Sequence, residues 1–209
     1  YRLRPIVPTY APESTWGEWL VDDQRHVASR TDVLVYATER LREPLRVAGE
    51  PYARLYASTS GSDADWVVKL IDVWPDEVPE SPKLGGYQQM LSADVLRGRF
   101  REDFTVAKLM ISADILRGRY RKDFAHPSPV KSGEVERYRW NLPAASHVFL
   151  PGHRIMVQIQ SSWFPLYDRN PQTFVPNIMF APPESYVKAT HRIWRTKEYP
   201  TAIELPVVE

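Results

Sequence analysis

Proline is the feature of this sequence that most restricts the fold. The 19 prolines are scattered along 209 residues and fall mainly between short apolar runs. Proline lacks a backbone N–H, so it cannot donate to a sheet ladder, and it also breaks the interior of a helix. This spacing favours many short strands joined by turns and argues against long helices.

The apolar runs between the prolines have the patterns of strands. Residues 134–140 alternate, for example, with Tyr138 and Trp140 on one face and Arg137 and Arg139 on the other. The turn Pro151-Gly152 between two runs predicts a hairpin. Short strands with Pro and Gly turns are typical of a sandwich or jelly roll. We therefore predict an all-β fold with strands over residues 32–38, 52–58, 66–73, 134–140, 147–150, 153–161 and 202–208.

The chain is expected to form one domain with an N-terminal extension. Residues 1–31 are irregular and form an arm, with Trp16 and Trp19 as its anchors. Residues 32–209 form the β domain, a size at which sandwiches stay undivided. Residues 162–184 form a long aromatic loop rich in proline, and loops of that length are usually functional or interfacial.

One segment occurs twice. Residues 91–104, LSADVLRGRFREDF, recur as residues 111–124, ISADILRGRYRKDF, at an offset of 20 residues (111 − 91). The duplicated units extend over about 88–107 and 108–127. A sandwich has one place for a given strand, so the copies could pair as a hairpin, one could be extruded, or one could exchange into a second molecule. The even offset preserves the alternation of faces, so either copy could fill the place.

The overall composition excludes several classes of function. The formal net charge is +1, which gives no steering of polyanions, so we expect neither nucleic acid nor an acidic membrane as partner. The chain has no cysteine, which excludes disulfides and thiolate chemistry but leaves the compartment open. No apolar run approaches the roughly 20 residues that span a bilayer. The chain begins without Met, so we expect it to be a piece of a longer polypeptide.

No hydrolytic or metal-binding motif is present. The G-x-S-x-G pattern of α/β-hydrolase nucleophiles is absent, and the serine-rich stretch at 58–63 follows a strand and is interpreted as a turn. No histidine has a partner at metal-ligand spacing. We therefore expect no catalytic residue, no metal and no cofactor, and no activity from this chain alone. The five histidines are His26, His126, His147, His153 and His191.

Two charged stretches are interpreted as structural. Asp22 and Asp23 precede Arg25, and adjacent carboxylates point apart, so salt bridges or capping of the arm are favoured over a shared proton. The rows Arg97/Arg99/Arg101 and Arg117/Arg119/Arg121 each place three arginines on one face of a predicted extended strand, where they could bind phosphate or carboxylate groups. The nearby aspartates favour a solvated or salt-bridged face.

The densest aromatic and polar cluster lies at residues 161–171. Exposed aromatic rings on a loop suit a protein interface or a platform for a sugar. The same loop could equally fold over its own sandwich, with Asp168 and Arg169 paired internally. The sequence leaves these alternatives open.

At this point several stretches show a family likeness. Residues 32–38 (DVLVYAT), 43–49 (EPLRVAG), 65–73 (DWVVKLIDV), 149–155 (FLPGHRI) and 161–170 resemble the C-terminal domain of X-Pro dipeptidyl peptidases, cocaine esterases and α-amino acid ester hydrolases. The likeness runs from about residue 22 to 208 and is strongest to the α-amino acid ester hydrolase branch, including Gly85-Gly86-Tyr87 and Pro171-Gln172-Thr173. The family pattern implies one copy of the SADILRGRYR segment, whereas this chain has two.

The resemblance implies a jelly-roll sandwich of the galactose-binding-domain-like type. It also implies a non-catalytic domain that packs on an α/β-hydrolase domain, borders its active-site cleft and leaves the triad upstream. A free-standing carbohydrate-binding module is the alternative function, and self-association into a homo-oligomer through the duplicated strand also stays open. The interface residues that we predict are Trp16, Trp19, Asp22, Asp23, Arg25, Trp163, Phe164, Tyr167, Asp168, Arg169 and Asn170.

Overall fold

The fold was obtained as a computed structural model that describes residues 22–92, 114–123, 125–164 and 167–209. Within these residues the helical elements are short, namely α2 (Arg25–Ala28), η1 (Pro82–Leu84), η2 (Gly118–Tyr120), η3 (Ile178–Phe180) and η4 (Pro183–Ser185). The strands are β1 (Val33–Ala37), β2 (Leu45–Gly49), β3 (Tyr52–Thr59), β4 (Asp65–Val73), β5 (Gln88–Ser92), β6 (Asp114–Arg117), β7 (Glu136–Asn141), β8 (Ala145–Phe149), β9 (Arg154–Gln160), β10 (His191–Ile193), β11 (Ala202–Glu204) and β12 (Val207–Val208).

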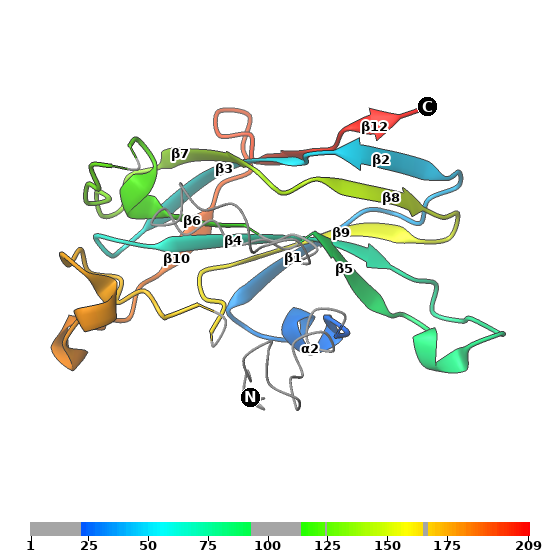
Figure 1. The fold of residues 1–209 in the computed structure, drawn as a ribbon, viewed down its shortest axis with the longest axis horizontal. Helices are drawn as coiled ribbons and strands as arrows, with labels where there is room; N and C mark the ends of the chain where they lie inside the picture. The colour runs from blue at the N-terminus through cyan, green and yellow to red at the C-terminus, as the bar shows by residue number, and fades with distance from the viewer. Residues whose placement is uncertain (1–21, 93–113, 124, 165–166) are drawn as a thin grey trace, which may run out of the picture.

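The strands form a two-layered antiparallel sandwich (Figure 1). One layer is the sheet β1–β9–β4–β5, in which β6 also pairs with β4. The second layer consists of β10–β3–β11, with β7 on the other edge of β3, and of β12–β2–β8. The predicted all-β sandwich is confirmed.

Proline marks the bends of the second layer. The chain passes directly from β2 to β3, from β7 to β8 and from β11 to β12, and a proline lies in each connection. Gly49 bends the first of these at φ 130°, where a Cβ would lie 3.2 Å from the Pro206 ring. Backbone hydrogen bonds from Leu142 to Pro51 (2.7 Å) and from Ala48 to Pro206 (3.0 Å) join the three bends. The two sheets of this layer are therefore joined along a line of prolines.

The core lies between the layers, and β4 is buried along its whole length. The Trp66 ring packs at 5.4 Å on Tyr138 of the facing β7. Leu70 belongs to a second cluster with Val47 and Phe149 of the other layer. The side chains of β4 that point away from the core are covered too, so both faces of this strand are buried. The main cluster contains Ala53, Leu55, Ala57, Ala64, Trp66, Val68, Tyr138, Trp140, Leu142 and Ile159.

Two expectations about strand pairing were wrong. The strands on either side of Pro151-Gly152 do not form a hairpin, because β8 pairs with β2 whereas β9 pairs with β1 and β4. This turn carries the chain from one layer to the other. The strand predicted over 202–208 is divided at Leu205-Pro206 into β11 and β12, which pair with β3 and β2.

The duplicated segment contributes to the layer that contains β4. The first copy begins in β5, and the second copy supplies β6 and η2. Both strands pair with the same edge of β4, at Leu70–Val73 for β5 and at Asp65–Val68 for β6. The structure thus places part of each copy along one edge.

Candidate functional site

Three predicted interface residues lie at the start of the described chain, next to α2. Asp23 Oδ2 accepts a hydrogen bond from Arg25 Nε (2.7 Å), and its Oδ1 accepts from the Gln88 backbone N–H (3.3 Å). Partial burial alone would raise the pKa of Asp23, but the hydrogen bonds from Arg25 and Gln88 lower it below its usual value. Asp23 is therefore an ion-pair partner that attaches the arm to β5. Asp22 is half-buried, Arg25 is exposed, and Trp16 and Trp19 lie outside the described residues.

The aromatic loop after β9 turns inward at two of its predicted residues. Trp163 and Tyr167 are buried and stack with ring centroids 5.8 Å apart. The Nζ of Lys69, on the outward face of β4, lies 4.9 Å from the Trp163 ring centroid. Phe164 is half-buried, with the Arg169 guanidinium 4.8 Å from its ring centroid. Trp163 and Tyr167 thus hold the loop on its own sheet.

Lys69 is a buried cation that the sequence analysis did not identify. Its Nζ donates a hydrogen bond to Gln24 Oε1 (2.9 Å), just before α2. Burial lowers the pKa of Lys69 to about 7. The only signal in the sequence was a lysine inside an apolar strand. The arm and the aromatic loop therefore meet over this residue, on the side of the sheet turned away from the second layer (Figure 1).

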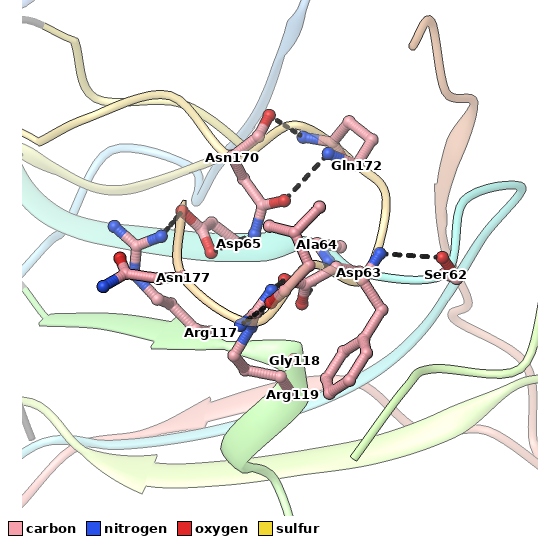
Figure 2. Close-up of polar contacts among 12 residues, drawn as sticks. Ser62, Asp63, Ala64, Asp65, Arg117, Gly118, Arg119, Asn170, Gln172 and Asn177 are labelled. Atoms are coloured by element: carbon pink, nitrogen blue, oxygen red, sulfur yellow. Dashed lines mark hydrogen bonds and ion pairs between the residues drawn. The ribbon is translucent and has the colours of Figure 1, made fainter. Parts of the chain in front are cut away.

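A second group of charges joins the aromatic loop to the duplicated segment (Figure 2). Asp65 Oδ1 accepts a hydrogen bond from Asn170 Nδ2 (2.8 Å), and its Oδ2 lies 3.4 Å from Arg117 Nη1. Burial raises the pKa of Asp65 to about 6, although Arg117 and Asn170 act in the opposite direction. Asn170 Oδ1 also accepts from the backbone N–H of Gln172, whose φ is 66°. Asn170 therefore shapes the loop from inside the protein.

Asp63 and Arg119 form a fully buried ion pair beside it, with Arg119 Nε 2.7 Å from Asp63 Oδ2. Arg119 Nη1 donates to the Val175 carbonyl (2.8 Å), and the guanidinium lies 4.8 Å from the Phe174 ring centroid. Arg121 pairs with Glu136 of β7. The expected salt bridges of this arginine row are confirmed, but their partners are Asp65, Asp63 and Glu136 rather than the nearby aspartates. The residues Arg97, Arg99 and Arg101 lie outside the described part of the chain. The predicted extended strand, however, ends at Arg117, and η2 follows.

The serine-rich stretch and two of the histidines have structural contacts. The Oγ of Ser62 accepts from the Phe174 backbone N–H (2.9 Å), and the Oγ of Ser60 accepts from Thr190 (2.9 Å), so the stretch at 58–63 anchors two segments. Asp72 lies between two histidines, with His153 Nδ1 and His147 Nε2 each 2.9 Å from its oxygens. Among the described residues, no group of three or more His, Cys, Asp or Glu side chains could hold a metal ion.

The described tryptophans do not form an exposed platform for a sugar. Trp66, Trp140 and Trp163 are buried. Trp74 and Trp194 are half-buried and pack edge-on against tyrosines.

In the part of the chain that the structure describes, no helix is long and apolar enough to cross a membrane.

An apolar cavity of about 360 Å³ opens between β9 and β11. The Arg195 guanidinium lies at its rim, 4.6 Å from the Tyr36 ring centroid. The remaining lining is mostly aliphatic and includes Leu70, Val157 and Ile203, and Thr38 and Thr201 are its polar members. Such a lining suits an apolar group and offers no acid or base for catalysis.

Four exposed apolar side chains of the described residues, among them the most exposed one, lie near one another in the sequence around η3 and η4. Phe180 is 84% exposed and Met179 50% exposed, and Tyr186 and Val187 are also exposed. We call these four residues the η3–η4 patch. Figure 1 shows that its segment extends from the lower layer, on the side that also carries α2.

Comparisons with known proteins give a consistent assignment. The family model described as the X-Pro dipeptidyl-peptidase C-terminal non-catalytic domain matches residues 2–204. Cocaine esterase from Rhodococcus sp. (strain MB1 Bresler) is 37% identical over 187 residues, which is 90% of this chain and 27% of that protein.

Two solved structures share both fold and sequence. An aminopeptidase from the marine sediment archaeon Thaumarchaeota archaeon is 70% identical with a TM-score of 0.86, over 100% of this chain and 31% of that one. An α-amino acid ester hydrolase is 49% identical with a TM-score of 0.83, over 98% of this chain and 31% of that one. The chain thus spans less than a third of the length of these relatives.

Proposed function

Because this chain belongs to the family of X-Pro dipeptidyl-peptidase C-terminal non-catalytic domains, we propose that it packs on an α/β-hydrolase domain and borders the active-site cleft of that domain. The observation that carries this proposal is the extent of the matches. Almost the whole chain matches 27% of a cocaine esterase and 31% of an α-amino acid ester hydrolase. The remainder of each relative is long enough for a catalytic domain. The domain's role is then to shape the cleft rather than to supply its reacting groups.

The η3–η4 patch is the surface that best suits this contact. Single exposed apolar residues are ordinary, but a group of four in one short segment, including a Phe that is 84% exposed, is typical of an interaction site. Large aromatic side chains at the centre of an interface usually contribute most of its binding free energy. Phe180 is therefore the first candidate for an anchor.

Some of the interface residues predicted from the sequence fit the same surface. Arg25 and Arg169 are exposed, and Phe164 and Asp168 are half-buried. The charged members, Arg25, Asp168 and Arg169, suit a polar rim around an apolar centre. The buried side chains of Trp163, Tyr167 and Asn170 would act indirectly, by holding the loop in place.

A chimera tests this role. The matching 31% of the archaeal aminopeptidase is replaced by this chain, which covers it from end to end at 70% identity. The chimera should hydrolyse an aminopeptidase substrate, whereas the chain alone should neither turn over a chromogenic ester nor react with a serine-directed phosphonate. Labelling of a serine in the isolated chain would overturn the proposal.

Single substitutions in the chimera then test the contact surface. Phe180→Asp should lower kcat/KM by tenfold or more, because an interface anchor contributes about 2 kcal/mol or more. Val207→Asp is the matched control, because Val207 is 56% exposed on β12, in the other layer. Equal activities of the two variants would exclude the η3–η4 patch as the contact surface.

A further inference from the structure

The two copies of the duplicated segment share one register on β4 beyond the irregularity at Leu70/Ile71, where β5 has one extra residue. Ser92 of β5 lies opposite Leu70, and Asp114 of β6 lies opposite Val68. In an antiparallel pair, two steps back along β4 are two steps forward along its partner. An uninterrupted β5 would therefore place residue 94 opposite Val68. The observed residue is Asp114, and the difference (114 − 94) equals the 20-residue offset of the repeat.

We call the edge of β4 from Asp65 to Val68 the β6 place. Only a few residues of the second copy make the specific contacts that hold a strand there. Arg117 lies beside Asp65, and Arg119 forms the buried pair with Asp63. Between them, the Gly118 backbone N–H donates to the Ala64 carbonyl at 2.6 Å. A Cβ on Gly118 would lie 3.1 Å from that carbonyl oxygen and 3.0 Å from the Val130 side chain, so even a small side chain would crowd both neighbours.

The first copy carries the same residues at the same spacing. Arg97, Gly98 and Arg99 stand 20 positions before Arg117, Gly118 and Arg119, and Asp94 stands 20 before Asp114. These first-copy residues lie outside the described part of the chain. Their sequence nevertheless meets each requirement of the β6 place: a first arginine for Asp65, a glycine against Ala64 and a second arginine for Asp63.

We propose that the β6 place accepts either copy, so that the chain interconverts between the observed form and one in which residues 94–97 replace Asp114–Arg117. The exchange changes no strand register and provides equivalents for Arg117, Gly118 and Arg119. It moves 20 residues of connection from before the strand to after it. Loop-closure entropy depends only on the logarithm of loop length, so this move changes the free energy little. The backbone hydrogen bond from Val130 to Ser62 (2.9 Å) holds the chain beyond the strand in both forms.

The absence of native cysteine allows a direct test. Val67 lies opposite Ile115, and residues directly opposite in an antiparallel pair are close enough for a disulfide. The full chain is prepared with Val67→Cys, Ile115→Cys and Val95→Cys, equilibrated in a glutathione buffer, trapped with acid and mapped by mass spectrometry. We expect both the 67–115 and the 67–95 disulfides. The two variants that carry only one of these pairs serve as references for complete formation.

Glycine substitutions supply matched controls. Gly118→Val should exclude the second copy from the β6 place and shift the disulfide to 67–95. Gly98→Val should shift it to 67–115 by the same reasoning. The 67–115 disulfide alone, unchanged by Gly118→Val, would overturn the proposal. A 95–115 disulfide would overturn it in favour of a hairpin between the copies, and a 67–95 disulfide found only in covalent dimers would overturn it in favour of exchange between two molecules.

Discussion

Replacing Lys69 by Met should stabilise the domain at neutral pH and remove part of its pH dependence. Met preserves the length of the side chain that packs under Trp163 but removes the buried charge. The pKa of Lys69 is about 7 against 10.5 for a free lysine, a difference of 3.5 pH units. At about 1.4 kcal/mol per unit, burial of the charged form costs on the order of 5 kcal/mol below pH 7.

The sign of the pH effect follows from this lowered pKa. Between pH 7 and 10.5 the unfolded chain carries the Lys69 proton and the folded chain does not, so the free energy of unfolding rises with pH. From pH 7.5 to 9.5 this rise is about 2 to 3 kcal/mol for the unsubstituted chain and is absent from Lys69→Met. The variant also loses the hydrogen bond to Gln24, which offsets its gain by about 1 kcal/mol.

Urea unfolding at several pH values between 7.5 and 9.5, followed by tryptophan fluorescence, measures both effects. Lys131→Met is the matched control, because the side chain of Lys131 is 72% exposed and its removal should shift the curve little. Parallel curves for the unsubstituted chain and Lys69→Met would refute the reasoning, because they would mean that Lys69 keeps its proton in the folded domain.

The other predictions concern buried carboxylates and one turn. Burial raises the pKa of Asp65 from 3.8 to about 6, so the free energy of unfolding of the unsubstituted chain should fall by about 3 kcal/mol between pH 4 and pH 7. Asp65→Asn should lack this fall in urea unfolding, and a constant difference between the two chains would contradict this. Asp63→Asn leaves the buried Arg119 unpaired and should cost about 3–5 kcal/mol by the same measurement, whereas Asp32→Asn at an exposed pair should cost about 1 kcal/mol or less. Gly152 has a φ of 86°, so Gly152→Ala should lower Tm by roughly 2–6 °C in a thermal scan, and an unchanged Tm would mean that the turn relaxes.

Local pattern was sufficient to predict most strands and the fold class. The alternation of Tyr138 and Trp140 with exposed arginines is reproduced in β7, because period-two side-chain orientation is a property of the strand itself. The proline spacing likewise predicted breaks between short strands. The missing nucleophile motif and the family likeness are also properties of the sequence alone.

Only the tertiary structure decided which strands pair and which charges are buried. The turn at Pro151-Gly152 resembles a hairpin locally, but it joins two layers because β9 is already paired on both sides, with β1 and β4. Lys69 is buried because Gln24 and Trp163, 45 and 94 residues away (69 − 24 and 163 − 69), cover it from two sides. Periodicity describes neighbours along the chain, whereas strand pairing and burial depend on residues that are distant in sequence, and these contacts form only when the whole sandwich folds.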